Sequence, residues 1–231
     1  MTNSADCENC WLNNFPAFKD CSPEARNEIC NNLEVKKYSR GEYLIQSGDE
    51  GDRVFCIKDG NVKVSKKGNS NKEFILWIAH HGDMVGLNSL IDEGPFAFSA
   101  SAINEVTACF IHAADLKIIL QKEPVFSMQL MKTLCEKLNF IEQRITSISR
   151  KKIKERSAEI LINLATRNGQ DTNMQVDYSI NDLASLVGTT KNYLYKVILE
   201  LTSKKILLVQ KRKIIINNYQ ALSSIAIGKE K

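Results

Sequence analysis

A regular hydrophobic repeat constrains the fold of this 231-residue chain more than any other feature. Residues 125–150 contain neither Gly nor Pro, and six apolar residues in this stretch are spaced 3, 4, 3, 4 and 3 positions apart. The six are Met131, Leu134, Leu138, Ile141, Ile145 and Ile148. This is the spacing of the a and d positions of a coiled coil. We predict a dimerisation helix within residues 121–150, starting near Pro124, that pairs with its own copy; the alternative is a helix packed on its own domain.

Short β-type runs separated by glycines precede this repeat. The runs are Tyr43–Ile45, Val54–Ile57, Val62–Val64, Phe74–Ile78 and Val106–Ile111, with glycines at 41, 48, 60, 82 and 86. Strands this frequent, with no helical stretch between them, are typical of an antiparallel roll. A short helix should begin after Ser22, because Ser caps well and Pro23 suits the first helical position. Residues 1–120 are therefore predicted to form an N-terminal segment and a β-roll, within an α+β chain.

Residues 151–231 have the pattern of a winged helix-turn-helix. Ser179 and Thr190 can cap two helices that surround a turn at Gly188, and two β-runs follow at 206–209 and 214–216. Apolar residues of the second helix face inward, which leaves its N-terminal half free to enter a major groove. The predicted DNA-binding residues are Thr190, Lys191, Asn192, Tyr195 and Lys196 on the helix, and Lys211, Arg212 and Lys213 on the wing.

The charge distribution agrees with a polyanionic partner for this last part. Residues 1–149 carry 16 Lys and Arg against 20 Asp and Glu, whereas residues 150–231 carry 15 against 7. The positive surplus is concentrated in Lys151–Arg156, in the second helix and in the wing. Such a surplus favours double-stranded DNA as the partner. The alternative is a helical hairpin whose basic face is only solvated.

Several classes of protein are excluded by what the sequence lacks. It contains no nucleophile–base order in a supporting context, no P-loop and no paired carboxylates, so we do not expect an enzyme. Residues 1–8 do not resemble a secretory signal, and no stretch approaches about 18 uninterrupted apolar residues. We therefore expect a cytoplasmic location and no membrane. Seven cysteines are an odd number, which argues against a fully paired disulfide framework.

The order of these parts resembles that of the Crp/Fnr transcription regulators along nearly the whole chain. The passages that carry the resemblance are Arg40–Asp49, Phe55–Val64, Gly82–Gly86 and the helix-turn-helix. The resemblance implies a cyclic-nucleotide-binding-like jelly roll whose signal repositions the dimer helices and the DNA-binding domains. It also implies a palindromic DNA site with half-sites about one helical turn apart, and RNA polymerase as a further partner.

A cyclic nucleotide is an unfavourable signal for this sequence. Family members that bind cyclic AMP have a Glu after the last glycine of the Gly-Asp-x-x-Gly motif, and an Arg about ten residues later for the phosphate. Here Leu87 follows Gly86, and residues 91–102 contain no Arg or Lys. A cyclic phosphate would lack its bidentate cationic partner.

An iron–sulfur cluster is the signal site that the cysteines favour. The oxygen-sensing Fnr branch holds a cluster with N-terminal cysteines and one cysteine on a late strand, and four thiolates suffice. The resemblance assigns the ligands to Cys7, Cys10, Cys21 and Cys109. Cys21 has an alternative role as an apolar residue before a helix cap, and Cys109 as a small buried hydrophobe. The Cys7/Cys10 pair could instead be a thiol switch or bind zinc. Cys30, Cys56 and Cys135 are interpreted as core or helix residues.

Heme is the third possibility for the signal site. The carbon-monoxide-sensing branch has a His where this chain has Asn88, and His80, His81 and His112 are interpreted as surface residues. A nitric-oxide-sensing heme branch with a less definite motif stays open.

The DNA site itself is expected to differ from that of the family. Many members have Glu at the position of Asn192 and Arg at the position of Lys196, and Tyr195 is bulkier than the usual residue. Since Asn favours adenine and Glu favours cytosine, we predict an altered half-site.

Overall fold

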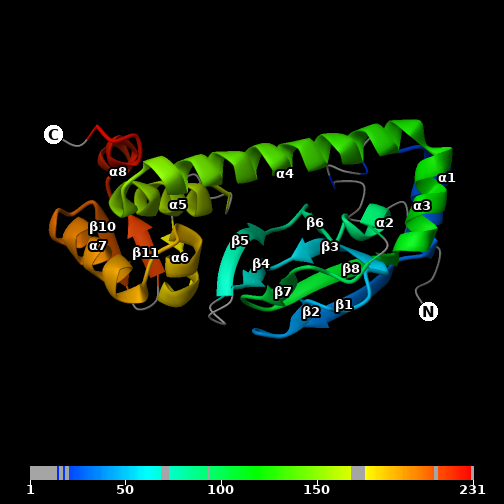
Figure 1. The fold of residues 1–231 in the computed structure, drawn as a ribbon, viewed down its shortest axis with the longest axis horizontal. Coiled ribbons are helices and arrows are strands. Elements are labelled where there is room, and N and C mark those ends of the chain that lie inside the picture. The colour runs from blue at the N-terminus through cyan, green and yellow to red at the C-terminus, as the bar shows by residue number, and fades with distance from the viewer. Residues whose placement is uncertain are drawn as a thin grey trace. The chain divides into compact units, whose positions relative to one another are not determined.

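The computed structural model describes Phe15, Phe18 and residues 21–68, 73–92, 94–167, 175–210 and 213–229. The chain divides into two compact units. One comprises Met1–Lys72 and Leu76–Asn139, and the other comprises Glu73–Ile75 and Phe140–Lys231. Helix α4, Pro124–Arg150, contributes its first part to the N-terminal unit and its last part to the C-terminal unit (Figure 1).

The N-terminal unit is built on two four-stranded sheets. The first has the order β1-β8-β3-β6, formed by Glu34–Tyr38, Val106–His112, Arg53–Asp59 and Met84–Val85. The second has the order β2-β7-β4-β5, formed by Tyr43–Ile45, Ser99–Ala102, Val62–Lys67 and Glu73–Ala79. The pairs with a described register are antiparallel. The predicted antiparallel roll is therefore confirmed.

Two hydrophobic clusters enclose the first sheet from its two sides. Phe55, Ile57 and Phe110 from this sheet pack in one cluster with Ile45 and Ala100 from the second sheet. Val54, Cys56 and Ile111 point to the opposite face, as the alternation of a strand requires, and pack with helical residues such as Leu116 and Phe126. Strands β3 and β8 of this sheet are buried on both faces and have nearly continuous hydrophobic runs, whereas the edge strand β1 is mostly exposed.

The described part of the N-terminal unit has three helices besides α4. They are α1 (Pro23–Asn31), α2 (Ser89–Asp92) and α3 (Ala113–Lys122). Helix α1 begins where the sequence predicted, because the Ser22 hydroxyl accepts a hydrogen bond from the Ala25 N–H at 3.1 Å. The sequence did not predict α2, α3 or strand β7. Strand β7 reads Ser-Ala-Ser-Ala and lacks the β-branched and aromatic residues that indicate a strand.

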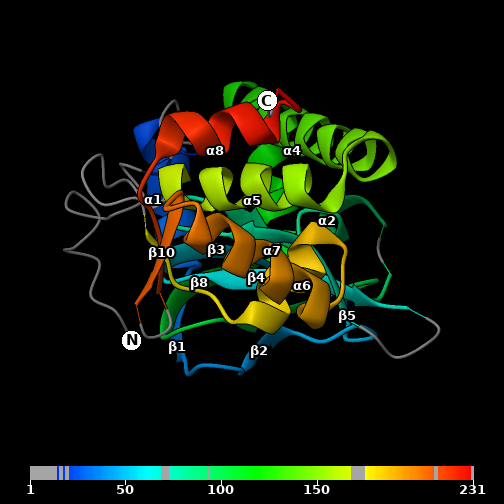
Figure 2. The same cartoon turned by 90° about the vertical axis from the view of Figure 1, so that its left-hand side faces the viewer.

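In its described residues, the C-terminal unit contains four helices and a small sheet besides the end of α4. The helices are α5 (Ile153–Arg167), α6 (Ile180–Val187), α7 (Lys191–Ser203) and α8 (Tyr219–Ala226), and they face the viewer in Figure 2. The sheet has the order β10-β11-β9, formed by Leu207–Gln210, Lys213–Ile216 and Gln175–Val176. Strand β9, which no sequence pattern predicted, pairs antiparallel with β11 through Val176 and Ile214.

Candidate functional site

Helices α6 and α7 form a helix-turn-helix whose ends are fixed as the sequence predicted. Ser179 caps α6 by accepting from the Asp182 N–H at 3.0 Å, and Thr190 caps α7 by accepting from the Tyr193 N–H at 3.4 Å. Gly188 ends α6 in the left-handed conformation with φ at 71°. Only glycine adopts this conformation without strain, so this position sets the turn.

The two faces of α7 differ in burial. Leu194, Val197, Ile198 and Leu201 are buried against the rest of the unit. The four α7 residues predicted to bind DNA, and the cap Thr190, are exposed: Lys191, Asn192, Tyr195 and Lys196. Tyr193 is also exposed, by 51%, although it is not one of the residues predicted to bind DNA. The N-terminal half of α7 thus presents amide, phenol and ammonium groups, which suit base edges and phosphates.

The wing is described only in part. Strands β10 and β11 pair in register from Leu207↔Ile216 to Gln210↔Lys213, which makes the predicted hairpin. Lys213 is exposed at the start of β11. Lys211 and Arg212 lie outside the described residues.

Basic residues of the run before the helix-turn-helix form contacts within the C-terminal unit. Within Lys151–Arg156, the Lys151 ammonium donates to the Ala226 carbonyl at 2.9 Å and lies 3.3 Å from Glu159. The Lys154 ammonium donates to Glu200 at 2.7 Å. These cations are therefore engaged inside the C-terminal unit, where carboxylates and helix-end carbonyls attract them.

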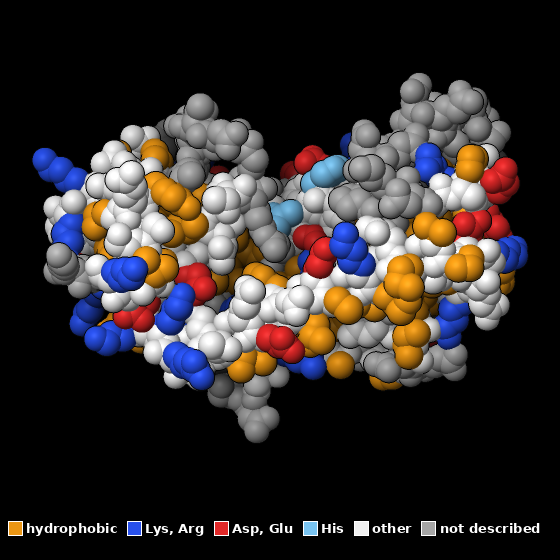
Figure 3. Space-filling view, turned by 90° about the horizontal axis from the view of Figure 1, so that it is seen from above, with side chains coloured by type: hydrophobic (Ala, Val, Ile, Leu, Met, Phe, Trp, Pro, Cys, Tyr) orange, Lys and Arg blue, Asp and Glu red, His pale blue; other side chains and the backbone are white. Residues whose placement is uncertain are grey.

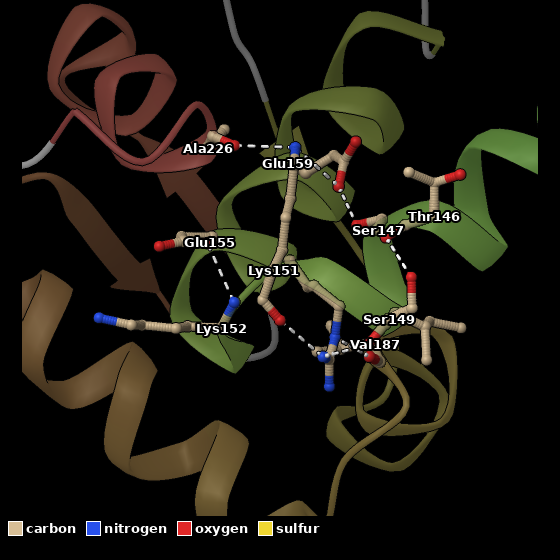
Figure 4. A network of polar contacts seen from close by, with 11 residues as sticks. Thr146, Ser147, Ser149, Lys151, Lys152, Glu155, Glu159, Val187 and Ala226 are labelled. Carbon is tan, nitrogen blue, oxygen red and sulfur yellow. Dashed lines mark hydrogen bonds and ion pairs between the residues drawn. The ribbon is translucent and has the colours of Figure 1, made fainter.

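A polar network joins the end of α4 to α5 and α8. The Ser147 hydroxyl donates to Glu159 at 2.5 Å, and Glu159 in turn faces Lys151, which reaches α8 (Figure 4). Arg144, only 9% exposed, donates to the Leu186 carbonyl of α6 at 2.5 Å. Burial lowers the pKa of the Arg144 guanidinium, and the nearby Glu159 carboxylate opposes that effect. No local pattern predicted this network, because it also includes the carbonyls of Leu186 and Ala226, which are distant along the chain.

The predicted dimer seam lies on the surface of the single chain. Met131, Leu134, Leu138, Ile145 and Ile148 are 39–63% exposed, and Ile141 is half-buried. Figure 3 looks down on α4 and shows hydrophobic side chains gathered along it. Phe126, Leu130, Arg144 and Ser147, on the other face of the helix, are buried. The helix therefore has one face packed in its own chain and a second apolar face that water would contact.

The Gly82–Gly86 motif ends the turn between β5 and β6, contains β6 and leaves it at Gly86. Gly86 has φ at 98°, and a Cβ atom there would lie 2.8 Å from the Arg53 carbonyl oxygen. Asp83 accepts from the His80 N–H at 2.9 Å and from the Lys137 ammonium of α4 at 2.6 Å. The same ammonium lies 3.6 Å from the centroid of the Trp77 ring. Gly86 thus allows the close approach of two backbone segments in the roll, and Asp83 connects the roll to the first part of α4 through Lys137.

The four predicted cluster ligands are only partly described. Cys7 and Cys10 lie outside the described residues. Cys21 is 6% exposed, precedes the α1 cap and packs in a hydrophobic cluster with Phe15 and Phe18, in agreement with its structural alternative. Cys109 is 1% exposed on β8, opposite Cys56 of β3.

The Cys56 thiol, which lies opposite Cys109, favours the protonated state. Burial raises the pKa of the Cys56 thiol far above its usual range, and the neighbouring Cys109 adds to this effect. Cluster ligands must be thiolates. Among the residues that the structure describes, no group of three or more His, Cys, Asp or Glu side chains could hold a metal ion. The described residues therefore do not build a cluster site by themselves, and such a site depends on Cys7 and Cys10.

His80 and His81 contact oxygen atoms of the N-terminal unit, and Leu87 and Asn88 stand at the two positions where family members place ligand-binding residues. His80 Nδ1 lies 2.7 Å from the Asn61 amide oxygen, and His81 Nδ1 lies 2.6 Å from the Lys58 carbonyl oxygen. Leu87, at the position where the resemblance would require a ribose-binding Glu, is buried in the hydrophobic cluster of α2 and α3. Asn88, at the heme-ligand position of the family, is exposed.

The helices of the described part include none that is long and apolar enough to cross a lipid bilayer.

Comparisons with protein families and solved structures agree with this architecture. Residues 35–123 match a model of the cyclic nucleotide-binding domain, and residues 155–225 match a model of the Crp-like helix-turn-helix domain. The chain is 25% identical over 210 residues to a CRP-like cAMP-activated global transcriptional regulator of Mycobacterium tuberculosis, covering 89% of this chain and 94% of that protein.

Two further proteins extend the comparison. The fumarate and nitrate reduction regulatory protein of Vibrio cholerae is 25% identical over 235 residues, covering 97% of this chain and 92% of that protein. The structure of FixK2 from Bradyrhizobium japonicum superposes with a TM-score of 0.77 at 20% identity, covering 84% of this chain and 96% of that one, which shows a shared fold. With its two family domains in this order and its relatives along nearly the whole length, the chain belongs to the Crp/Fnr family of DNA-binding transcription regulators.

Proposed function

We propose that this regulator acts as a homodimer that binds a palindromic duplex through α7 and the wing, under the control of a redox or diatomic-gas signal. The parts are a sensor at residues 1–120, a dimerisation helix at 121–150 and a DNA-binding domain at 151–231. Contact with RNA polymerase would follow DNA binding, as the family resemblance implies.

The observation that carries the DNA-binding proposal is the exposed face of α7. Lys191, Asn192, Tyr195 and Lys196 lie on the half of the helix that follows the turn, while the opposite side is buried. An α-helix fits the major groove, and the residues near its N-terminus are those that reach base edges. Lys213, together with Lys211 and Arg212, would contact phosphates from the wing.

The salt dependence of binding tests this face. A duplex selected by the wild-type protein from a random-sequence pool serves as the probe. The Lys191→Gln and Lys196→Gln variants should each bind it more weakly, because each removes a cation near the phosphates. The slope of log affinity against log salt is negative, and its magnitude should decrease by about 1.8 for each variant. The reason is that a dimer loses two contacts and each contact releases about 0.9 counterion.

The Lys204→Gln variant is the matched control for these substitutions. Lys204 is an exposed lysine just after the other end of α7, where it pairs with Glu200 at 3.2 Å. This variant should keep the wild-type slope. A wild-type protein without salt-sensitive DNA binding would instead support a cyclic-nucleotide-type signalling module that does not bind DNA.

The apolar seam of α4 supports the homodimer. Two copies of this helix in parallel would bury the exposed a and d residues against each other, as in a coiled coil. A symmetric dimer requires a symmetric DNA site, which accounts for the palindrome.

The nature of the signal is the most specific part of the proposal. One relative is named as cAMP-activated and another for fumarate and nitrate reduction. Leu87 is buried and residues 91–102 carry no Arg or Lys, which favours a signal other than cyclic AMP. Cys7 and Cys10, with Cys109 and Cys21, are the residues that would hold an iron–sulfur cluster, which would supply redox sensitivity there. A thiol switch at Cys7 and Cys10 uses the same pair.

Anaerobic purification of the full-length chain distinguishes these possibilities. A cluster predicts a brown protein that contains iron and acid-labile sulfide and bleaches in air. The Cys7→Ser and Cys10→Ser variants should both lose the colour, whereas Cys135→Ser, an exposed cysteine on α4, should keep it. A Soret band would replace the cluster proposal with a heme-dependent or other small-ligand-dependent regulator. A colourless, metal-free protein that still regulates transcription would rule out the cluster.

A further inference from the structure

The side chain of Arg156, near the start of α5, contacts the ends of two other helices. Its Nη1 donates to the carbonyl of Ile148 at 3.2 Å and of Lys151 at 2.9 Å, at the C-terminal end of α4. Its Nε donates to Val187 at 3.0 Å and its Nη2 to Gly188 at 3.3 Å, at the C-terminal end of α6. Four of the five N–H groups of an arginine are accounted for by these bonds. Figure 4 shows Lys151 and Val187 together at this junction.

The contacts at α6 complete the cap of that helix. The last carbonyls of a helix have no partner within it and need another donor. At the end of α6 the Ser185 carbonyl accepts from the Gly188 N–H at 3.2 Å, and the Leu186 carbonyl accepts from Arg144. Arg156 supplies the donors for the remaining two. A guanidinium is planar and permanently charged, so it suits two negative helix ends at once better than an ammonium does.

The carbonyls that Arg156 binds lie at the turn of the helix-turn-helix. Gly188 is the turn residue, and Thr190, two positions later, caps α7. The exposed residues that would read DNA begin at Lys191. Any shift of this turn would therefore shift the N-terminal end of α7 relative to the end of α4.

We infer that Arg156 is a positioning residue for DNA recognition, which holds the helix-turn-helix turn on the C-terminal end of the dimerisation helix. The inference rests on the proposed function, because it takes α7 as the helix that reads bases. Arg156 acts by fixing the aim of α7 in each subunit of the dimer, and it does not bind DNA phosphates itself, since its donors are engaged within the unit.

The Arg156→Gln variant distinguishes a role in orienting α7 from a role in binding DNA phosphates. It should keep the dimer and the wild-type salt slope, because the phosphate-binding lysines remain. Its preference for the selected duplex over a scrambled duplex of equal composition should fall by about tenfold or more, which is the discrimination of one good base contact. Binding to both duplexes is measured with the active protein concentration fixed by stoichiometric titration, so that partial unfolding does not imitate the loss.

Arg150→Gln is the matched control, because Arg150 is an exposed arginine at the same end of α4. It should leave the preference unchanged. The Arg156→Lys variant retains the charge without the planar fork, and it should recover only part of the preference; it also decides the matter if Arg156→Gln does not fold.

Two results would overturn the inference. A wild-type preference in Arg156→Gln and Arg156→Lys, with at most a lower melting temperature, would reduce Arg156 to a stabilising residue. A decrease of about 1.8 in the magnitude of the salt slope, as expected for the lysines of α7, would show that Arg156 contacts phosphates. Failure of the proposed function gives a different result: the wild-type protein itself would then show no preference between the two duplexes.

Discussion

The Ile145→Asp variant should be a monomer that has lost tight binding to its selected duplex. Ile145 is 63% exposed in the single chain and occupies a seam position of α4. Burying an Ile side chain contributes about 1.5–3 kcal/mol, and a symmetric dimer loses this contribution twice. The substitution also places two carboxylates opposite each other in an apolar seam. The dimer should therefore weaken by at least about 3–6 kcal/mol, which sedimentation equilibrium can measure.

The neighbouring Thr146→Asp substitution is the control for this effect. Thr146 is exposed and lies one position off the seam, so the same charge there should leave the dimer intact. Loss of DNA binding should accompany loss of the dimer, because a monomer reaches only one half-site. A stable Ile145→Asp dimer would show that α4 pairs through another face or packs only within its own chain. Ile141 is a less direct probe, because it is already half-buried in the monomer.

The Asn192→Glu substitution should change which base is preferred at one position of each half-site. Asn192 is exposed on the groove-facing half of α7, where an amide can bond adenine bidentately and a carboxylate can accept from the cytosine amino group. We expect the preference to change from adenine to cytosine, with a difference of about 1–3 kcal/mol at each half-site. Selection from a random-sequence pool with both proteins, followed by sequencing, measures the change.

Asn181→Glu is the control that adds the same charge elsewhere. Asn181 is exposed on α6, so this variant should weaken binding to all duplexes alike without changing the preferred base. The wild-type protein should also discriminate against the palindrome common to the family. If it binds that palindrome as tightly as its own selected duplex, or if Asn192→Glu keeps the wild-type preference, then Asn192 does not read the base.

Local signals in the sequence predicted several elements of each unit. Ser22, Ser179 and Thr190 cap helices as predicted, and Gly188 forms the turn. These positions are predictable because a cap or a left-handed turn depends on a few neighbouring residues. The small-residue strand β7 and the two-residue strand β9 were missed, because pairing with distant strands holds them in place, and their own residues do not.

Periodicity and helix caps were enough to predict the order of the parts, the apolar seam of α4 and the polar face of α7. Which charges remain available depends instead on the folded chain. Lys151, Lys154 and Arg156 belong to one run of basic residues, and a basic run by itself suggests a surface for DNA. In the fold, these three side chains bond carboxylates and helix-end carbonyls within the C-terminal unit. It also placed Cys109 beside Cys56 in the core, where burial raises the pKa of the Cys56 thiol. The physical reason is that the role of an ionisable group depends on its solvent exposure and on partners distant in sequence, which only folding brings together.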